Sequence, residues 1–172
     1  MAPASASAAS VDLSGTAYEF NKPAKRLAGA TVRVAERPRL KATVRANGAY
    51  RLAVPRRARV TPYVDAPGYH RIYLQTFTTA GKDLKRVNFQ VPTDATYDAL
   101  AVLLKVPLDG AGNPRECAIV STFSTRKVRK LSFNGFVGYG AHGVAGATAS
   151  VTPRLPSPFY FNAQVIPDPA QK

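Results

Sequence analysis

The sequence predicts an all-β fold, an antiparallel Greek-key sandwich of about seven strands, followed by one short helix and a partial second β unit. Short segments alternate between apolar and polar residues, turn signals separate these segments, and one later stretch changes to helical spacing. We therefore divide the chain into a terminal segment 1–11, a sandwich 12–91, a helix and connector 92–130, and a second sandwich-like unit 131–172.

The first segment, MAPASASAASV, is uncharged and consists mainly of small residues. It lacks the basic start and the apolar stretch of a complete export signal, but its Ala-Ser-Ala triplet resembles the end of one. We interpret residues 1–11 as the disordered remnant of a removed export signal, which predicts a secreted, extracellular protein. A plain disordered terminus is the alternative.

The strand period of two is clearest in two segments. Val32 and Val34 alternate with polar residues in one, and Tyr50 begins the apolar face of the other. The pair Asn47-Gly48 stands just before Tyr50 and is a signal for a tight hairpin turn, so we expect Tyr50 to be buried beside it. The predicted strands are 12–20, 30–36, 40–45, 49–54, 58–65, 69–78 and 85–91.

Residues 92–107 follow a different pattern. Thr93 or Asp94 can cap a helix, and Pro107 can end it. Between them, apolar residues recur at helical spacing: Tyr97, Leu100, Leu103 and Leu104. This pattern predicts one short helix after the sandwich.

An octapeptide occurs twice with variation, as LAGATVRV at 27–34 and as VAGATASV at 144–151. Each copy follows a predicted strand, SGTAYEF before the first and SFNGFVGYG before the second. A tight turn at the Gly followed by a strand explains the pattern, and chance similarity is the alternative. A complete second unit on this register would extend beyond Lys172, so we expect an incomplete chain with open sheet edges or strand exchange between two copies.

Five short motifs resemble the carboxypeptidase regulatory-like domain, and the resemblance covers residues 12–91. The motifs are S-G-T at 14–16, L-A-G-A-T-V at 27–32, N-G-A-Y-R-L at 47–52, V-P at 54–55 and P-G-Y at 67–69. Where that family commonly has an acidic or Thr-Asp pair before the N-G turn, this chain has Val44-Arg45-Ala46. This departure argues against calcium at the turn.

The resemblance implies a transthyretin-like sandwich, which is also described as a carbohydrate-binding-like fold. Such domains are usually non-catalytic modules of secreted or surface proteins, and they help with folding, spacing or binding. The resemblance therefore implies a secreted accessory or binding module that uses no cofactor. A neighbouring domain is among its expected partners.

The chain has 24 Lys and Arg against 10 Asp and Glu, a net charge of +14. Strand alternation directs four cations of the sandwich outward: Arg33, Lys41, Arg45 and Arg51. We predict that this basic face binds an anionic cell-wall polymer or an acidic polysaccharide. Nucleic acid is not expected, because no recognition helix or RNA-binding signature accompanies the charge. A merely solvated basic surface is the alternative.

A second binding surface is predicted on the strand 69–78. Alternation places five residues on one face: Tyr69, Arg71, Tyr73, Gln75 and Phe77. Ile72 and Leu74 on the opposite face suit the core, which leaves an aromatic stripe that can stack on carbohydrate. The alternative is that these rings cover the sheet or contact a neighbouring domain, and the absence of Trp argues against a strong sugar platform.

Candidate groups for catalysis or metal binding are few. The chain has one Cys, at position 117, which excludes an internal disulfide and a thiolate zinc cluster, and only two His. No run approaches the length of apolar sequence that spans a membrane. A hydrolase with its site near His142 or Cys117 is the alternative to a binding module, and a purely structural spacer is a third interpretation.

Overall fold

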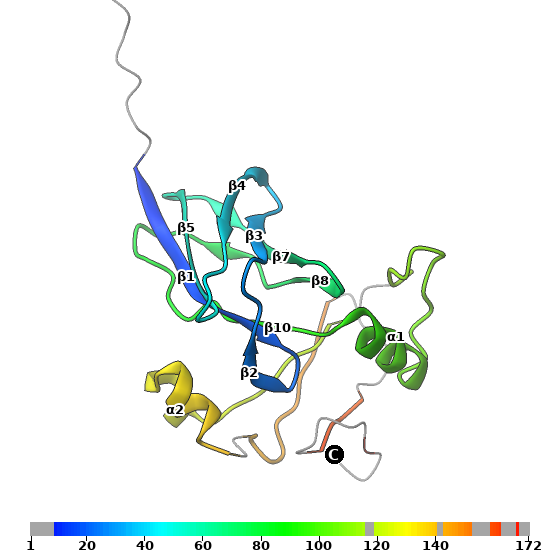
Figure 1. The fold of residues 1–172 in the computed structure, drawn as a ribbon. Helices are drawn as coiled ribbons and strands as arrows, with labels where there is room; N and C mark the ends of the chain where they lie inside the picture. Colours follow the sequence, from blue (N-terminus) through cyan, green and yellow to red (C-terminus); the bar gives the residue numbers. More distant parts are fainter. Residues whose placement is uncertain (1–8, 116–118, 141–142, 153–158, 163–167, 169–172) are drawn as a thin grey trace, which may run out of the picture. The chain divides into compact units, whose positions relative to one another are not determined.

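The computed structural model describes residues 9–115, 119–140, 143–152, 159–162 and 168 (Figure 1). The chain divides into two units, Met1–Asp94 and Ala95–Lys172. The first unit consists mainly of β-strands, and nearly all of its strand pairs are antiparallel. The predicted all-β class with a short helix is confirmed.

The first sheet is built around β1 (Ser10–Glu19). On one edge, residues 10–16 of β1 pair antiparallel with β5 (Ala49–Pro55). Tyr18 and Glu19, at the end of β1, pair antiparallel with β2 (Lys22–Arg26). Along the other edge, β10 (Phe89–Val91) runs parallel to β1, so the first and last strands of the sandwich are neighbours. The sequence did not predict β2, because its residues KPAKR show no apolar alternation.

The second sheet has the strand order β4-β3-β7-β8. Its members are β3 (Thr31–Val34), β4 (Arg37–Thr43), β7 (Pro62–Ala66) and β8 (Tyr69–Tyr73), and all its pairs are antiparallel. The core lies between the two sheets. Its largest fully buried side chains come from both of them and include Leu13, Val32, Val54, Val64 and Phe89.

A separate two-stranded ribbon joins β6 (Arg59–Val60) to β9 (Phe77–Thr78). The predictions of single strands over 58–65 and 69–78 are therefore wrong in part, because each segment is interrupted. β8 ends at Tyr73, the N–H of Leu74 still donates to Pro62 O at 2.9 Å, and the next strand begins at Phe77. Local alternation cannot show where a strand changes its partner, since both halves keep the same period of two.

The Asn47-Gly48 turn is confirmed, but the hairpin pairing is wrong. Gly48 N donates to Arg45 O at 2.8 Å, and Gly48 has a left-handed φ of +82°. The strands that the turn joins, β4 and β5, belong to different sheets. A strand can bury its apolar face beside its chain neighbour or across the core from it, and the alternation looks the same in both cases.

Tyr50 is buried as predicted, and Gly15 makes room for it. The two residues are directly opposite each other in the register of β1 and β5. The Tyr50 hydroxyl donates to Val87 O, which lies beyond β1, so the ring crosses β1 where β1 has no side chain. The ring centroid lies 5.7 Å from that of Phe89. Burial also raises the pKa of Tyr50.

α1 (Asp94–Leu103) begins at the last residue of the first unit, and the described part of the second unit also contains the short 3₁₀ helix η1 (Arg126–Lys130) and α2 (Phe133–Val137). α1 confirms the predicted helix. α2 falls within SFNGFVGYG, where a strand was predicted, so that prediction is wrong. Its apolar residues also fit helical spacing, and the Ser132 hydroxyl caps the helix by accepting from the N–H of Gly135 at 3.1 Å.

The two copies of the octapeptide share a turn but not a strand. In both copies the fourth residue donates its N–H to the carbonyl of the first, at 3.2 and 3.3 Å, and the Gly has a left-handed φ of +83° or +70°. The first copy continues into β3, which β4 and β7 flank, whereas no strand occurs among the described residues after Asp94. The expected partial second β unit is therefore not seen among the described residues of 131–172.

Among the helices that the structure describes, none has the length and apolar character needed to span a membrane.

Candidate functional site

The outer face of the second sheet presents a row of four large side chains. Alternation turns the Val residues of β3 and β7 into the core, so the residues beside them point outward. The strand register places one residue from each strand in line, in the order Lys41, Arg33, Tyr63 and Tyr73. We call this line the transverse row. At the usual spacing of neighbouring strands it extends over about 14 Å.

The aromatic half of the transverse row is a stacked pair. The ring centroids of Tyr63 and Tyr73 are 5.1 Å apart, and the planes are tilted by 32°. Tyr73 is 52 % exposed, whereas Tyr63 beside it is only 8 % exposed. Tyr63 thus supports the pair from within the sheet, and Tyr73 offers its ring to a ligand.

Guanidinium groups lie beside this pair and are held in place by one carboxylate. The Arg71 guanidinium carbon lies 5.1 Å from the centroid of the Tyr63 ring, and Arg71 Nε donates to Asp65 Oδ1 at 2.6 Å. The other oxygen of Asp65 forms an ion pair with Arg33 Nε at 3.8 Å. The pKa of Arg71 is raised, mainly by its hydrogen bond to Asp65 and secondly by its contact with Tyr73. Two cations on either side of Tyr63 are therefore oriented before any ligand arrives.

The predicted aromatic stripe is divided in the structure. Arg71 and Tyr73 remain on the outer face, and Gln75 is exposed beyond the end of β8. Tyr69 and Phe77 instead pack against the core. The pairing of β7 with β8 shifts register between Val64 and Ala66, and the strand ends at Tyr73, so the period of two does not continue through all five residues.

The predicted basic face is divided as well. Arg33 and Lys41 are neighbours on the second sheet, and Arg45 is exposed in the turn after β4. Arg51 lies on β5 in the first sheet, where it forms an ion pair with Asp12. The four cations therefore do not form one surface. Tyr63, which the analysis of the sequence missed, had a signal, because the alternation that buries Val64 turns Tyr63 outward.

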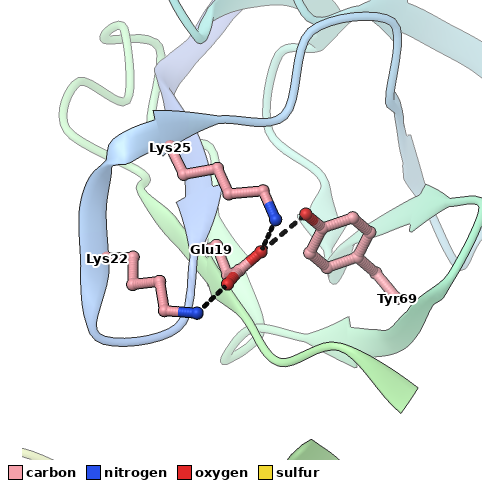
Figure 2. Close-up of polar contacts among 4 residues, drawn as sticks. All are labelled: Glu19, Lys22, Lys25 and Tyr69. Atoms are coloured by element: carbon pink, nitrogen blue, oxygen red, sulfur yellow. Dashed lines mark hydrogen bonds and ion pairs between the residues drawn. The ribbon is translucent and has the colours of Figure 1, made fainter. Parts of the chain in front are cut away.

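A second polar cluster lies at the end of β1, where the Glu19 carboxylate binds three partners (Figure 2). Lys22 Nζ lies 2.8 Å from Oε1, and Lys25 Nζ lies 2.6 Å from Oε2. The Tyr69 hydroxyl donates to Oε2 at 2.7 Å. The cluster joins β1 and β2 of the first sheet to β8 of the second, which explains why Tyr69 leaves the stripe.

The partners of Glu19 set its protonation state. The Glu19 side chain is only 4 % exposed, while both lysine side chains extend into solvent. The hydrogen bonds from Lys22, Lys25 and Tyr69 lower the pKa of Glu19 to about 2. A carboxylate with this pKa and with both oxygens occupied stays ionised at neutral pH, so its role is to stabilise the junction of the sheets rather than to transfer protons.

We expect Glu19→Gln to lower the free energy of unfolding at pH 7 by about 1 to 2 kcal/mol, because it weakens the hydrogen bonds from Lys22, Lys25 and Tyr69. The loss is limited because both lysines are exposed and solvent screens their charges. The folded state lowers the pKa of Glu19, so its contribution to the free energy of unfolding is complete above the unfolded-state pKa of about 4.3. That contribution is lost as the pH falls toward 2. Urea titrations at several pH values should therefore show the difference from wild type shrinking between about pH 4.5 and pH 2. Asp98→Asn, on an exposed residue of α1, is the control, and an equal effect there would contradict this role of Glu19.

The residues proposed for the enzyme alternative, Cys117 and His142, lie outside the described residues. Within the described ranges, no group of three or more His, Cys, Asp or Glu could hold a metal ion. The hydrolase alternative therefore stays a prediction.

Comparison with known proteins gives a similarity of structure. No family model matches the sequence, and no curated protein matches it. The solved structures that resemble this chain include one chain of a type II cohesin–X–dockerin complex, an N-terminal interface mutant, from Acetivibrio cellulolyticus. The two chains have a TM-score of 0.40 and 14 % sequence identity, and the match covers 48 % of this chain and 58 % of the length of that chain.

Proposed function

We propose that this protein is a secreted, non-catalytic binding module that holds an acidic polysaccharide on the outer face of its second sheet. The observation that carries the proposal is the transverse row, in which an exposed Tyr ring lies in line with two cations and beside the oriented guanidinium of Arg71. The surface is a sheet face built from four strands, which suits an extended polymer.

The chemistry of the row matches two properties of such a polymer. The face of a sugar ring is apolar and stacks on an aromatic ring such as Tyr73. The carboxylates of an acidic sugar can pair with Arg33, Arg71 and Lys41, and guanidinium groups bind carboxylates through two parallel hydrogen bonds. An anionic cell-wall polymer offers the same combination of hydroxyl and acidic groups. Affinity should be modest, since the chain has no Trp.

We also propose that the first unit is a carboxypeptidase regulatory-like domain. The support is that each glycine of the matching motifs has a structural requirement. Gly29, Gly48 and Gly68 have left-handed φ values, which other residues rarely adopt. Gly15 stands where a side chain would collide with Val87, and Tyr50 of the N-G-A-Y motif crosses it.

We expect Tyr73→Ala and Arg71→Gln each to weaken binding to polygalacturonate about tenfold, the loss of one stacked ring or one charge-assisted contact. Calorimetric titration measures this, and affinity for the wild type should also fall as salt is added, because ionic contacts are screened. Both side chains are exposed, so the fold should tolerate these changes.

Arg51→Gln is the matched control, because it removes one cation from the first sheet and should leave the affinity unchanged. Neutral dextran tests the requirement for charge, and single-stranded DNA tests the rival ligand, since aromatic and basic surfaces also stack bases. Binding to DNA but not to the polysaccharide, or wild-type affinity in Tyr73→Ala, would refute the proposal.

A further inference from the structure

Two basic segments of the first unit lie side by side and are joined by a buried threonine. Residues 55–59 (PRRAR) lead from β5 into β6, and residues 79–82 (TAGK) follow β9. Thr79 is fully buried, and its hydroxyl accepts from Ala58 N and donates to Pro55 O, both at 2.7 Å. Thr79 N also donates to Ala58 O at 2.8 Å. These bonds fix the backbones of the two segments against each other.

Gly81 gives the Arg56 side chain a defined place between the segments. A Cβ on Gly81 would lie 2.6 Å from Nε of Arg56 and 2.8 Å from its Nη2, so the guanidinium group rests against the glycine backbone. Gly81 also has a left-handed φ of +83°. Glycine meets both requirements, because it has no Cβ and adopts a positive φ without strain. The guanidinium of Arg56 is therefore positioned next to the residue that follows Gly81, which is Lys82.

Arg57 occupies a backbone conformation that is unfavourable for an arginine. Its φ is +58°, in the left-handed region that glycine adopts far more readily. The N–H of Arg57 donates to Thr79 O at 2.6 Å, so the surrounding structure holds the residue in this conformation. A cationic side chain at a position that suits glycine better indicates that the charge has a use of its own.

Arg56, Arg57 and Lys82, which we call the basic corner, are all exposed. Within the part of the chain that the structure describes, none of the three forms an ion pair. The carboxylate nearest to them in the sequence is Asp83, and its Oδ1 accepts from Asp12 N on β1 at 3.0 Å. Three cations from two adjoining segments are thus available to one anionic group.

We propose that the basic corner binds the phosphate group of a phosphate monoester. Such a group has about two negative charges at neutral pH and three free oxygens, so it can accept from two guanidinium groups and an ammonium group together. A carboxylate or a phosphodiester has a single charge and leaves one of these cations without a partner. The same dianion occurs as inorganic phosphate and at the end of a phosphorylated sugar. The basic corner shares no residue with the transverse row and does not depend on the polysaccharide proposal.

The first test titrates the ¹⁵N-labelled full chain with methyl phosphate at pH 7.5 and follows amide resonances by NMR. The amides of Arg57, Gly81 and Lys82 should shift and reach saturation. Dimethyl phosphate and acetate, which have one charge each, should bind at least about tenfold more weakly, the loss of one charge-assisted contact. Equal affinity for acetate or dimethyl phosphate would overturn the proposal.

Inorganic phosphate and glucose 6-phosphate, titrated in the same way, distinguish the two sources of the dianion. Equal affinity for the two would show that the dianion alone is recognised. Tighter binding of glucose 6-phosphate would show that the ligand is a phosphorylated sugar. Both results support a phosphate site, and the absence of saturable shifts at the basic corner with either ligand would refute it.

The second test removes the cations one at a time. Arg57→Gly and Arg56→Gln should each weaken methyl phosphate binding about five- to tenfold. Because glycine suits the left-handed backbone, Arg57→Gly should not lower the midpoint of urea unfolding. A lowered midpoint would show that Arg57 is retained for folding rather than for its charge, and it would count against the proposal.

Arg45→Gln is the matched control for these variants. Arg45 is exposed and its N–H donates to Ala49 O, so it lies at the opposite end of β5 from Arg56. The substitution removes one cation and should leave the affinity for methyl phosphate unchanged. Equal weakening in Arg45→Gln would show that net charge alone governs binding. Wild-type affinity in both Arg57→Gly and Arg56→Gln would place the phosphate elsewhere, and either result overturns the proposal.

Discussion

Tyr50→Ala is expected to lower the free energy of unfolding by about 3 to 5 kcal/mol, the cost of truncating a large aromatic residue in a core. Tyr50 is only 3 % exposed, its ring packs against Phe89, and its hydroxyl bonds to Val87 O. The substitution therefore leaves a cavity and an unsatisfied carbonyl. Urea unfolding followed by far-ultraviolet circular dichroism measures the change, since the chain has no Trp to report by fluorescence.

Tyr50→Phe separates the two contributions. It keeps the ring and removes only the hydroxyl, so it should cost about 1 kcal/mol, the typical value of one hydrogen bond. A loss below about 0.5 kcal/mol in Tyr50→Ala would mean that the ring does not fill the core between β5 and β10.

Gly15→Ala is expected to cost about 3 kcal/mol, at the upper end of the range for overpacking. A Cβ on Gly15 would lie 2.0 Å from Val87 O, and the obstacle is backbone, which cannot rotate away. The hydrogen bonds that hold this segment to β1, from Ser14 N to Leu84 O and from Val87 N to Ser14 O, would have to lengthen. Urea unfolding measures this loss too.

Gly143→Ala is the matched control for that substitution. Among the described residues, an added Cβ meets nothing within 4 Å there, and the φ of Gly143 is not left-handed, so the free energy of unfolding should change by less than about 0.5 kcal/mol. An unfolding midpoint of Gly15→Ala equal to that of the wild type would show that β1 and the segment around Val87 are not in close contact.

Local alternation was sufficient to predict the strands that bury one face. β3 lies within its predicted range, and β5 exceeds its predicted range by one residue, Pro55. Both were predictable because Val32 and Tyr50 each belong to an apolar row that can only face the core. β2 escaped prediction because it is stabilised by its partners: it pairs with β1, and its two lysines bind Glu19. Contacts with partner residues do not require an alternation of apolar and polar residues within β2, so the sequence of β2 carries no strand signal.

The candidate site was predicted only in part for the same reason. The sequence identified Arg71 and Tyr73 on one strand, and Arg33 and Lys41 on two others, but it could not show that strand order brings them together around Tyr63. The sequence also could not show that Arg51 lies on a different sheet from Arg33 and Lys41. Alternation tells which residues point outward, but it does not tell to which sheet they belong.

The parallel pairing of β1 with β10 has a consequence for how the sandwich is made. β1 comes first in the chain, yet one of its edges is completed only by the segment that ends the sandwich; Asp12 and Asp83, which are joined by a hydrogen bond, are 71 residues apart. Closing so long a loop is slow, and β1 keeps an open edge until the segment before β10 arrives. A chain that emerges gradually from a ribosome therefore cannot complete this sandwich until residue 91 is free, and the unpaired edge of β1 stays open to other strands until then.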